Sequence, residues 1–185
     1  VTQQEDVERM VETCLKALGR IDILVNNAGI DRPASLLKYK EEQWDLVMDV
    51  NLKGVFRCTQ AVAQEMAKRR YGKIVNISSD AGKMGFWGET AYCPAKSGVI
   101  GLTRVSALEL AKKGINVNAI CPGLIDTALS RTIPESLRQK MANEVPKGRV
   151  GTPRDIGNLA AFLASDEADY ITGQSISCDG GWIMY

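Results

Sequence analysis

The sequence predicts an α/β fold, a doubly wound parallel sheet with helices on both of its faces. Stretches with helical apolar spacing alternate along the chain with short apolar runs, which is typical of parallel sheets joined by right-handed crossovers. Polar or glycine-containing clusters follow three of the short runs. The 185 residues suffice for one domain, and 45% hydrophobic and 24% charged residues are ordinary for a globular protein.

The first half of the chain is expected to form two helices and two strands in alternation. Thr2 and Glu5 match a capping box at the start of the first helix, and Gly19 suits its end. Gly72 is expected to stop the second helix, after basic residues that favour the negative end of the helix dipole. The expected elements are a helix over residues 2–18, a strand over 23–25, a long helix over 41–70 and a strand over 74–77.

The second half is expected to form three helices and two strands. Lys113 and Gly114 end the first of these helices, and Thr152 with Pro153 opens the last. The expected elements are a helix over residues 92–111, a strand over 115–120, a helix over about 134–144, a helix over 153–163 and a strand over 174–178. Small residues inside the first helix (Ala95, Gly98 and Gly101) would allow another helix to approach, which favours a partner subunit.

Composition excludes several functional classes. The net charge of +1 offers no electrostatic support for nucleic acid or membrane binding. No apolar run approaches ~20 residues, and no signal-peptide pattern is present. Five scattered cysteines without a CxxC pattern indicate reduced thiols and a cytoplasmic protein. The absence of histidine excludes a Ser-His-Asp triad and any histidine-ligated metal, and no metal site is expected.

The three clusters that follow the apolar runs are expected to lie at one edge of the sheet. Residues 26–29 (Asn-Asn-Ala-Gly) follow the first strand, residues 78–79 (Ser-Ser) the second, and residues 122–123 (Pro-Gly) the third. Ligands bind outside the carboxyl ends of parallel strands, so this edge is the expected functional site. Each cluster alone would read as an ordinary turn or strand end.

Tyr92 and Lys96 supply acid–base chemistry at that edge. They are one helical turn apart and therefore share a face of their helix. An ordinary Tyr has a pKa near ~10, and a nearby positive charge lowers it. A Ser hydroxyl opposite could bind a carbonyl or alcohol oxygen. No side chain carries hydride, so such a site needs a redox cofactor. A Tyr-x-x-x-Lys pair alone is common, and only the joint order of the clusters makes it informative.

The combination of motifs resembles the short-chain dehydrogenase/reductase family along the whole chain. The family places its catalytic serine thirteen residues before the tyrosine, a spacing that selects Ser79 over Ser78. The matching motifs are Asn26-Asn27-Ala28-Gly29, Asn51, Ser79, Tyr92-x-x-x-Lys96 and the segment from Pro122 to Thr127.

The resemblance implies a catalytic role for four residues. Tyr92 would be the general acid and base, and Ser79 would orient and polarise the substrate oxygen. Lys96 would lower the Tyr92 pKa and hydrogen-bond the nicotinamide ribose. Asn51 would hold a water in a proton relay. Without the resemblance, Asn51 could equally be a polar helix residue that faces solvent.

The resemblance also implies NAD or NADP as the cofactor, with NADP slightly favoured. One group of residues would line the adenosine side: Asn27, Ala28 and Gly29. A second group would surround the nicotinamide: Pro122, Gly123, Ile125 and Thr127, together with Tyr92 and Lys96.

The resemblance implies a Rossmann-like fold of three layers, but one part of the family pattern is not found. Members carry a T-G-x-x-x-G-x-G turn and a cofactor-selecting residue, within roughly the first 60 residues and three strands. We therefore expect residues 1–185 to be a single domain, the C-terminal portion of such a fold. Alone they would bind cofactor weakly and expose residues 23–25 as an apolar sheet edge.

The substrate and partners are expected from resemblance within the family. Residues 145–149 and 164–173 are similar to 3-oxoacyl-acyl-carrier-protein reductases of fatty acid biosynthesis, which act on 3-oxoacyl thioesters. Arg70 and Lys113 occupy places where basic residues meet the acidic carrier, although they could equally complement helix dipoles. A homotetramer is expected, as in the family.

Two alternative functions are also compatible with the sequence. Residues 79–89 are similar to hydroxyacyl-CoA and other secondary-alcohol dehydrogenases, so this activity is the second candidate among enzymes. Phe86, Trp87 and Leu129 would flank the substrate beneath a lid over residues 124–150. A non-catalytic structural subunit, unable to bind cofactor by itself, is the reading from another class.

Overall fold

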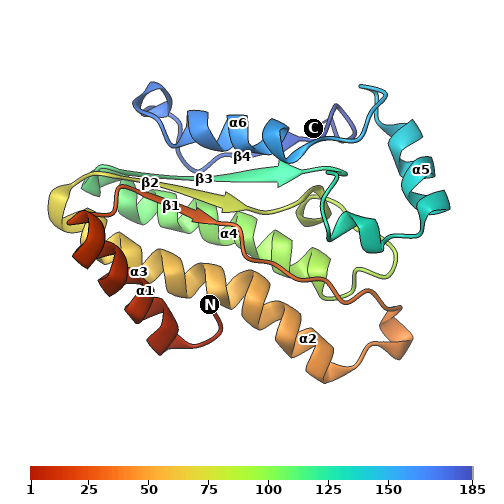
Figure 1. Cartoon of the computed structure of the whole chain (residues 1–185), viewed down its shortest axis with the longest axis horizontal. Coiled ribbons are helices and arrows are strands. Elements are labelled where there is room, and N and C mark those ends of the chain that lie inside the picture. Colours follow the sequence, from red (N-terminus) through yellow and green to blue (C-terminus); the bar gives the residue numbers. More distant parts are fainter. Residues whose placement is uncertain (185) are drawn as a thin grey trace.

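The structure is a computed structural model that describes residues 1–184. Four parallel strands form one sheet in the order β1-β2-β3-β4, as Figure 1 shows. The strands are β1 (Ile23–Asn26), β2 (Gly72–Ile77), β3 (Ile115–Pro122) and β4 (Ser175–Cys178). The predicted α/β class with a parallel sheet is confirmed, and each predicted strand lies within about two residues of an observed one.

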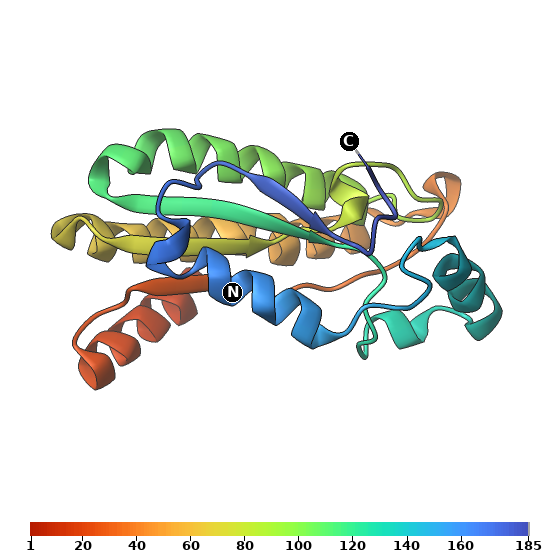
Figure 2. The ribbon, with the colours of Figure 1, turned by 90° about the horizontal axis from the view of Figure 1, so that it is seen from above.

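Helices cover both faces of the sheet. On one face lie α3 (Gly54–Arg69) and α4 (Tyr92–Leu110), with α1 (Gln4–Leu18) packed against α3. The opposite face carries α6 (Pro153–Leu163), so the sheet is enclosed between two layers (Figures 1 and 2). Two further helices, α2 (Glu41–Met48) and α5 (Glu135–Glu144), extend toward and beyond the carboxyl ends of the strands.

Alternation along the strands divides the core between the two layers. Ile74 and Val117 belong to the apolar cluster beneath α1, α3 and α4. Val75 and Ile120 point the other way and pack with Leu163 of α6. Successive side chains of a strand point to opposite faces of the sheet. A strand with a continuous apolar run therefore contributes to the core on both faces.

Polar side chains in the middle of the sheet are paired with one another. The Asn26 amide donates to Thr59 Oγ1 at 3.0 Å and to Asn76 Oδ1 at 2.7 Å. Asn76 in turn donates to Thr103 Oγ1 of α4 at 2.9 Å. These four residues are all buried. Buried polar groups are stable only when hydrogen-bonded, so this chain fixes how β1 and β2 sit on α3 and α4.

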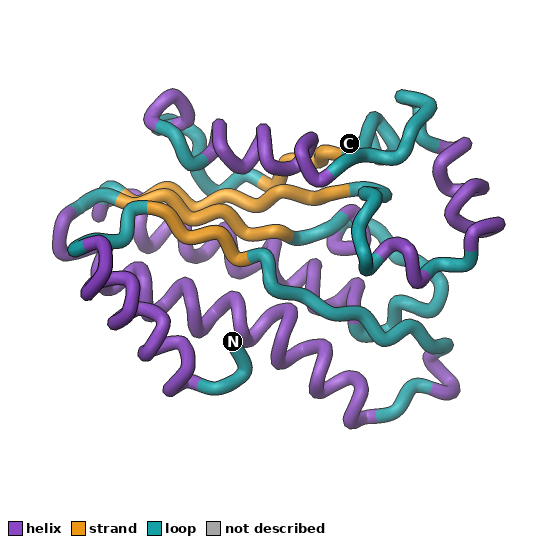
Figure 3. The backbone as a smooth tube through the Cα atoms, in the orientation of Figure 1, coloured by secondary structure: helices purple, strands orange, loops and turns teal. Residues whose placement is uncertain are grey.

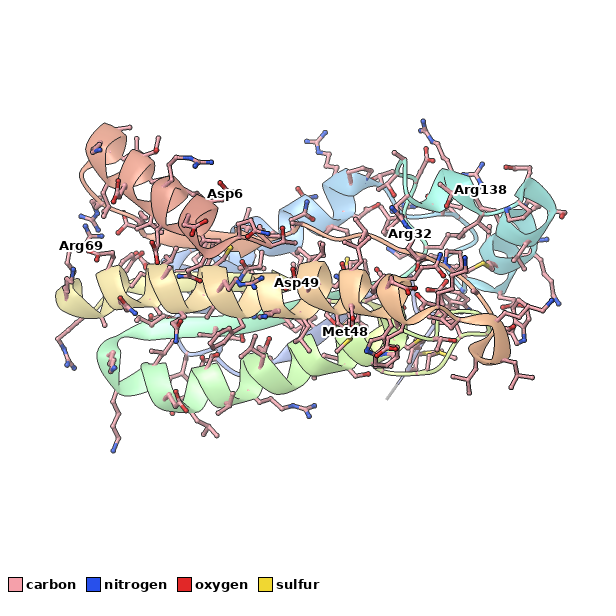
Figure 4. The ribbon with its side chains drawn as sticks, turned by 90° about the horizontal axis from the view of Figure 1, so that it is seen from below. Asp6, Arg32, Met48, Asp49, Arg69 and Arg138 are labelled. Carbon is pink, nitrogen blue, oxygen red and sulfur yellow. The ribbon has the colours of Figure 1, made fainter. Side chains whose placement is uncertain are left out.

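The predicted long helix contains one irregular turn. α2 and α3 are joined without a break by a π-helical segment, Asp49–Lys53. Figure 4 labels Met48 and Asp49 at this junction, where Asp49 accepts a 2.9 Å ion-pair hydrogen bond from Arg57. Single π turns inside α-helices are frequent at functional sites, and this one carries Asn51.

Two predicted helix caps are wrong, although the predicted bounds lie within two residues of the observed ones. The first helix has Gln3 at its N-cap without a side-chain bond, so Thr2 and Glu5 form no capping box. The helix before β2 ends at Arg70 in the left-handed region (φ 54°), not at Gly72. Gly72 is required for close packing instead, because a Cβ there would lie 2.3 Å from Met66 Sδ. Gly19, in contrast, ends α1 with φ 72° as predicted.

The small residues of α4 are explained in part within the chain. A Cβ on Gly98 would lie 2.7 Å from Leu52 Cδ2, so this glycine admits the π segment. Ala95 is fully buried in the cluster with Val47. Only Gly101 faces open space. A partner subunit is therefore not needed to account for Ala95 and Gly98.

Strand β1 forms one edge of the sheet in the part of the chain described. Ile23 and Val25 are 50% and 45% exposed, in agreement with the expected apolar edge. None of the described helices combines the length and the apolar character needed to cross a membrane.

The two glycines of α4 give opposite predictions for stability. Gly98→Ala should lower the free energy of unfolding by about 1–2 kcal/mol, because the added methyl group collides with Leu52. Gly101→Ala should raise it by about 0.5–1 kcal/mol, because alanine favours helix and meets no neighbour. Urea unfolding measures both. A destabilising Gly101→Ala, accompanied by a smaller particle in light scattering, would instead reveal a close subunit contact there.

Candidate active site

The carboxyl ends of the first three strands meet at one edge, where the connecting loops gather. Figure 3 shows these loops, in teal, beyond the ends of the orange strands. Asn26, Ile77 and Pro122 are the last residues of β1, β2 and β3. The predicted convergence of the three clusters is thus present in the fold.

The two serines after β2 have different surroundings. Ser78 is 2% exposed, and its hydroxyl donates to the backbone carbonyl of Lys96 at 2.8 Å. The Ser79 hydroxyl accepts from the backbone N–H of Ala81 at 3.1 Å and lies close enough to Tyr92 to influence the pKa of its phenol. Ser78 therefore ties the loop to α4, whereas Ser79 faces the phenol.

Tyr92, the first residue of α4, is held in its protonated form. Burial raises its pKa to about 12, and the negative charges of Asp31 and Glu89 add to the increase. The neighbouring Ser79 hydroxyl lowers the pKa of Tyr92, because a hydroxyl donor stabilises the phenolate. A buried phenol of this kind is a proton donor at neutral pH.

Lys96 is buried beside Tyr92 but does not lower its pKa in this arrangement. The ammonium lies 5.5 Å from the centre of the Tyr92 ring and donates to the carbonyl of Ile77 at 2.8 Å. Burial lowers the pKa of Lys96 itself to about 8. The expected depression of the Tyr92 pKa is therefore absent, since desolvation outweighs a charge that is itself weakened and directed to Ile77.

Asn51 is fully buried, so the solvent-facing alternative is wrong. Its side-chain amide forms two bonds of 2.8 Å with the backbone of Ile30, one to the N–H and one to the carbonyl. A Cβ on Gly29 would lie 3.5 Å from Asn51 Oδ1 and 3.6 Å from Lys96 Nζ. The loop after β1 is thereby held against both polar groups.

The other residues expected to bind cofactor occupy the same edge with different exposure. Asn27 and Ala28 are exposed immediately after β1. Pro122 ends β3. Ile125 forms a backbone bridge with Gly151, and the Thr127 hydroxyl accepts from the Ser130 N–H at 3.3 Å. Ile125 and Thr127 thus shape the loop after β3.

The edge fits a ligand rich in hydroxyl groups. A lysine ammonium has three donor hydrogens, and Ile77 accepts one from Lys96. Two remain for ribose hydroxyls, beside the Gly29 backbone, where a Cβ would lie only 3.6 Å from Lys96 Nζ. This arrangement fits a nicotinamide nucleotide.

A pair of carboxyl groups beside Tyr92 was missed in the sequence. Glu89 and Asp31 interact directly, and burial together with the Asp31 charge raises the pKa of Glu89 to about 8. Buried oxygens of both residues, and the Tyr39 hydroxyl, have no hydrogen-bond partner among residues 1–184. The loops meet because Ala34 N–H donates to the Gly88 carbonyl at 2.9 Å. No local pattern signals a contact between such distant segments.

The three apolar residues expected to flank the substrate have different surroundings. Phe86 stacks against Trp182 with ring centres 5.5 Å apart. Trp87 and Leu129 are 90% and 43% exposed, so they offer apolar surface at the rim.

Arg70 and Lys113 lie at the other end of the sheet. They precede β2 and β3, whose opposite ends carry the site. The Arg70 guanidinium donates to the Lys112 carbonyl at 2.8 Å, as expected of a residue that complements a helix end. Figure 4 shows the neighbouring Arg69 at the end of the molecule opposite Arg32 and Arg138.

The fold and the site together define a class of enzyme. A parallel sheet carries at its carboxyl edge the neighbouring hydroxyl groups of Ser79 and Tyr92 and a buried lysine. These groups can exchange a proton with a substrate oxygen, and hydride must come from a nicotinamide cofactor. This class is the NAD(P)-dependent oxidoreductases.

Comparison with known proteins defines the family. A family model described as enoyl-(acyl carrier protein) reductase matches residues 1–183. The 3-oxoacyl-[acyl-carrier-protein] reductases FabG of Thermotoga maritima and Vibrio cholerae are 48% and 43% identical over 184 residues. Those alignments cover 100% of this chain and 75% of each relative. The chain belongs to the short-chain dehydrogenase/reductase family and is an NAD(P)-dependent oxidoreductase most like the FabG enzymes.

A solved structure supports the same assignment. A crystal structure from Agrobacterium tumefaciens, described as a 2-deoxy-D-gluconate 3-dehydrogenase with bound NADP, has a TM-score of 0.85 and 47% identity. The match covers 88% of this chain and 67% of that protein.

The buried lysine predicts a particular pH dependence of stability. The pKa of Lys96 is about 8 in the fold and 10.5 ordinarily, so between these values the unfolded chain binds more protons. The Lys96 contribution to the free energy of unfolding should therefore rise by about 3 kcal/mol as pH increases through that interval, whereas Tyr92 and the buried thiols, whose pKa values are raised, act in the opposite direction. Lys96→Met should lose this rise in urea titrations, whereas the exposed control Lys113→Met should keep it. Parallel curves for Lys96→Met and the unmodified protein would contradict the burial of a titrating ammonium.

Proposed function

We propose that this protein reduces 3-oxoacyl thioesters with NADPH at the edge formed by Ser79, Tyr92 and Lys96. The observation that carries the proposal is the grouping of Ser79 with a half-buried, protonated Tyr92, whose phenol ring has the Lys96 ammonium above it. The FabG relatives, named for this reaction, align with the entire chain and support the substrate class.

Tyr92 would act as the acid in reduction. Its phenol donates the proton that the substrate oxygen needs to become a hydroxyl, and Ser79 donates a second hydrogen bond to that oxygen. The nicotinamide supplies hydride to the carbonyl carbon when bound. In the reverse direction the Tyr92 phenolate would be the base.

The remaining residues would bind and align the cofactor. Lys96 offers its two free donors to the nicotinamide ribose, and Gly29 leaves room for the nucleotide on the β1 side. Asn51 holds the loop after β1 through Ile30, and the second lone pair of its Oδ1 can bind a relay water. Other residues proposed to contact the cofactor are Asn27, Ala28, Pro122, Gly123, Ile125 and Thr127.

Partner binding is proposed on the same basis. The full set of 185 residues would act as one domain in a homotetramer, and Arg70 and Lys113 would contact an acidic acyl carrier protein. Arg70 and Lys113 lie at the opposite end of the sheet from Ser79. The length of β3, with eight residues at ~3.3 Å each, puts this separation at about 25 Å. A carrier bound there would have to span the sheet or serve a neighbouring subunit.

The carboxyl pair favours a second candidate function, oxidation of a hydroxylated secondary alcohol. Glu89 and Asp31 present buried acceptors near Tyr92, which suit substrate hydroxyl groups better than an alkyl chain. The Agrobacterium structure, described as a sugar-acid dehydrogenase, is compatible with this alternative.

Tyr92→Phe should lower kcat by about 10²–10⁴-fold, because the substrate oxygen loses its proton donor. NADPH affinity, measured by quenching of cofactor fluorescence, should change little. Tyr39→Phe is the matched control, since Tyr39 lies on the same carboxyl pair but outside the proton path. A Tyr92→Phe enzyme with ordinary turnover would overturn the mechanism.

A substrate panel separates the two candidate functions. We expect acetoacetyl-pantetheine to be reduced with at least about tenfold higher kcat/KM than crotonyl-pantetheine or a polyhydroxylated ketone. Glu89→Gln should then leave thioester reduction largely intact. If the polyhydroxylated ketone is preferred, and Glu89→Gln lowers its kcat/KM by about tenfold or more, the alternative function is correct.

A further inference from the structure

A second carboxyl pair lies next to Ser79 and is formed by Asp80 and Asp179. Asp80 directly follows Ser79, is 1% exposed, and faces Asp179 in the loop after β4. Both carboxyl oxygens of Asp80 are buried without a hydrogen-bond partner of ordinary geometry in residues 1–184. A carboxylate buried in this way is costly, whereas a protonated carboxyl group can donate to a neighbouring acceptor.

Asp179 is the acceptor of the pair. One of its oxygens accepts from the Gly181 N–H at 2.9 Å and the other from the Ile183 N–H at 2.7 Å. These bonds fold the segment from Asp179 to Ile183 around the side chain of Asp179. Both Asp179 oxygens already accept a hydrogen bond, whereas neither oxygen of Asp80 has such a donor, so the shared proton is placed on Asp80.

Three loops meet at this pair. A Cβ on Gly123 would lie 2.8 Å from Asp179 Cβ and 3.2 Å from Asp80 Oδ2. The loops after β2, β3 and β4 thus contact one another at two carboxyl groups and a glycine. One of these loops carries Ser79, and another follows Pro122.

The other titratable groups around Asp80 come from three elements. The Lys83 ammonium, bonded to Ser177 Oγ at 2.8 Å, lowers the pKa of Asp80. The neighbouring thiols, Cys121 of β3 and Cys178 of β4, have raised pKa values because they are buried. Burial and the charge of Asp179 outweigh Lys83 and raise the pKa of Asp80 to about 7.

We propose that Asp80 is a positioning residue whose proton, shared with Asp179, clamps the segment of residues 179–183 to the catalytic edge. Loss of that proton places two negative charges against each other in a buried space and releases the segment. The site would then be fully assembled below neutral pH and loosened above it.

The direction of the stability change follows from the raised pKa. Between the ordinary value of 3.8 and about 7 the folded protein binds a proton that the unfolded chain has released. This contribution to stability is complete below the lower value and is lost as pH rises through about 7. An amide at this position would not show the loss.

Trp182 reports the clamp directly, since it lies within the segment and stacks on Phe86. We would titrate its fluorescence between about pH 5 and 9 in a protein that carries Trp44→Phe and Trp87→Phe. A transition with a midpoint near 7 is expected. Asp80→Asn should abolish it and keep the low-pH emission throughout, whereas the control Glu89→Gln should leave the midpoint unchanged.

The activity of the intact enzyme gives a second measurement. The pH profile of kcat/KM should lose its ionisation near 7 in Asp80→Asn, whereas a merely structural role would lower activity equally at every pH. If Asp80→Asn does not fold, carbon-13 NMR of the aspartate carboxyl groups in the unmodified protein tests the proposal, because it follows the titration of each aspartate. The absence of any aspartate titrating above about pH 5.5, or an unmoved midpoint in Asp80→Asn, would overturn the proposal.

Discussion

The parallel register of the first three strands is the constraint on which the site depends. Asn26 pairs with Asn76 across β1 and β2, and the side chains of the two residues are hydrogen-bonded as well. This contact fixes where both strands end, and β3 is aligned to β2 along the whole length of β2. A shift of one residue would reverse the faces of β1 and separate the asparagines. The strands that lead to Gly29, Ser79 and Pro122 therefore end at the same level of the sheet.

Much of this arrangement could be predicted from the sequence because it depends on periodicity and strand order. Alternating helical and apolar patterns predicted all four strands and the main helices, and the parallel topology followed from connection rules. The same rules brought the clusters after β1, β2 and β3 to one edge. Thirteen-residue spacing distinguished Ser79 from Ser78, and the structure gives the two hydroxyl groups different partners. Local patterns were weaker at helix ends, where Arg70 adopts a conformation usually left to glycine.

The environment of the catalytic groups could not be predicted from the sequence. Burial depends on every surrounding element, so the raised pKa of Tyr92 and the lowered pKa of Lys96 have no signature in a Tyr-x-x-x-Lys pattern. The contact of Glu89 with Asp31 likewise arises only when two loops meet. Around the site, Lys96 is the buried cation among several buried or half-buried acids. A bound cofactor with ionised phosphates would add negative charge and strengthen the protonation of Lys96.

The π-helical turn at Asp49–Lys53 has a consequence for sequence change in this protein. It places one extra residue in an otherwise regular helical path, and each residue of an α-helix turns the chain by about 100°. The wider π turn absorbs this residue, so α2 and α3 keep nearly the phase of one regular helix. Deletion of a single residue there would restore a regular α-helical turn and remove the local widening that presents Asn51 to Ile30, while α3 would stay packed on the sheet. The expected loss is therefore in the loop after β1 that Asn51 holds, and not in the fold.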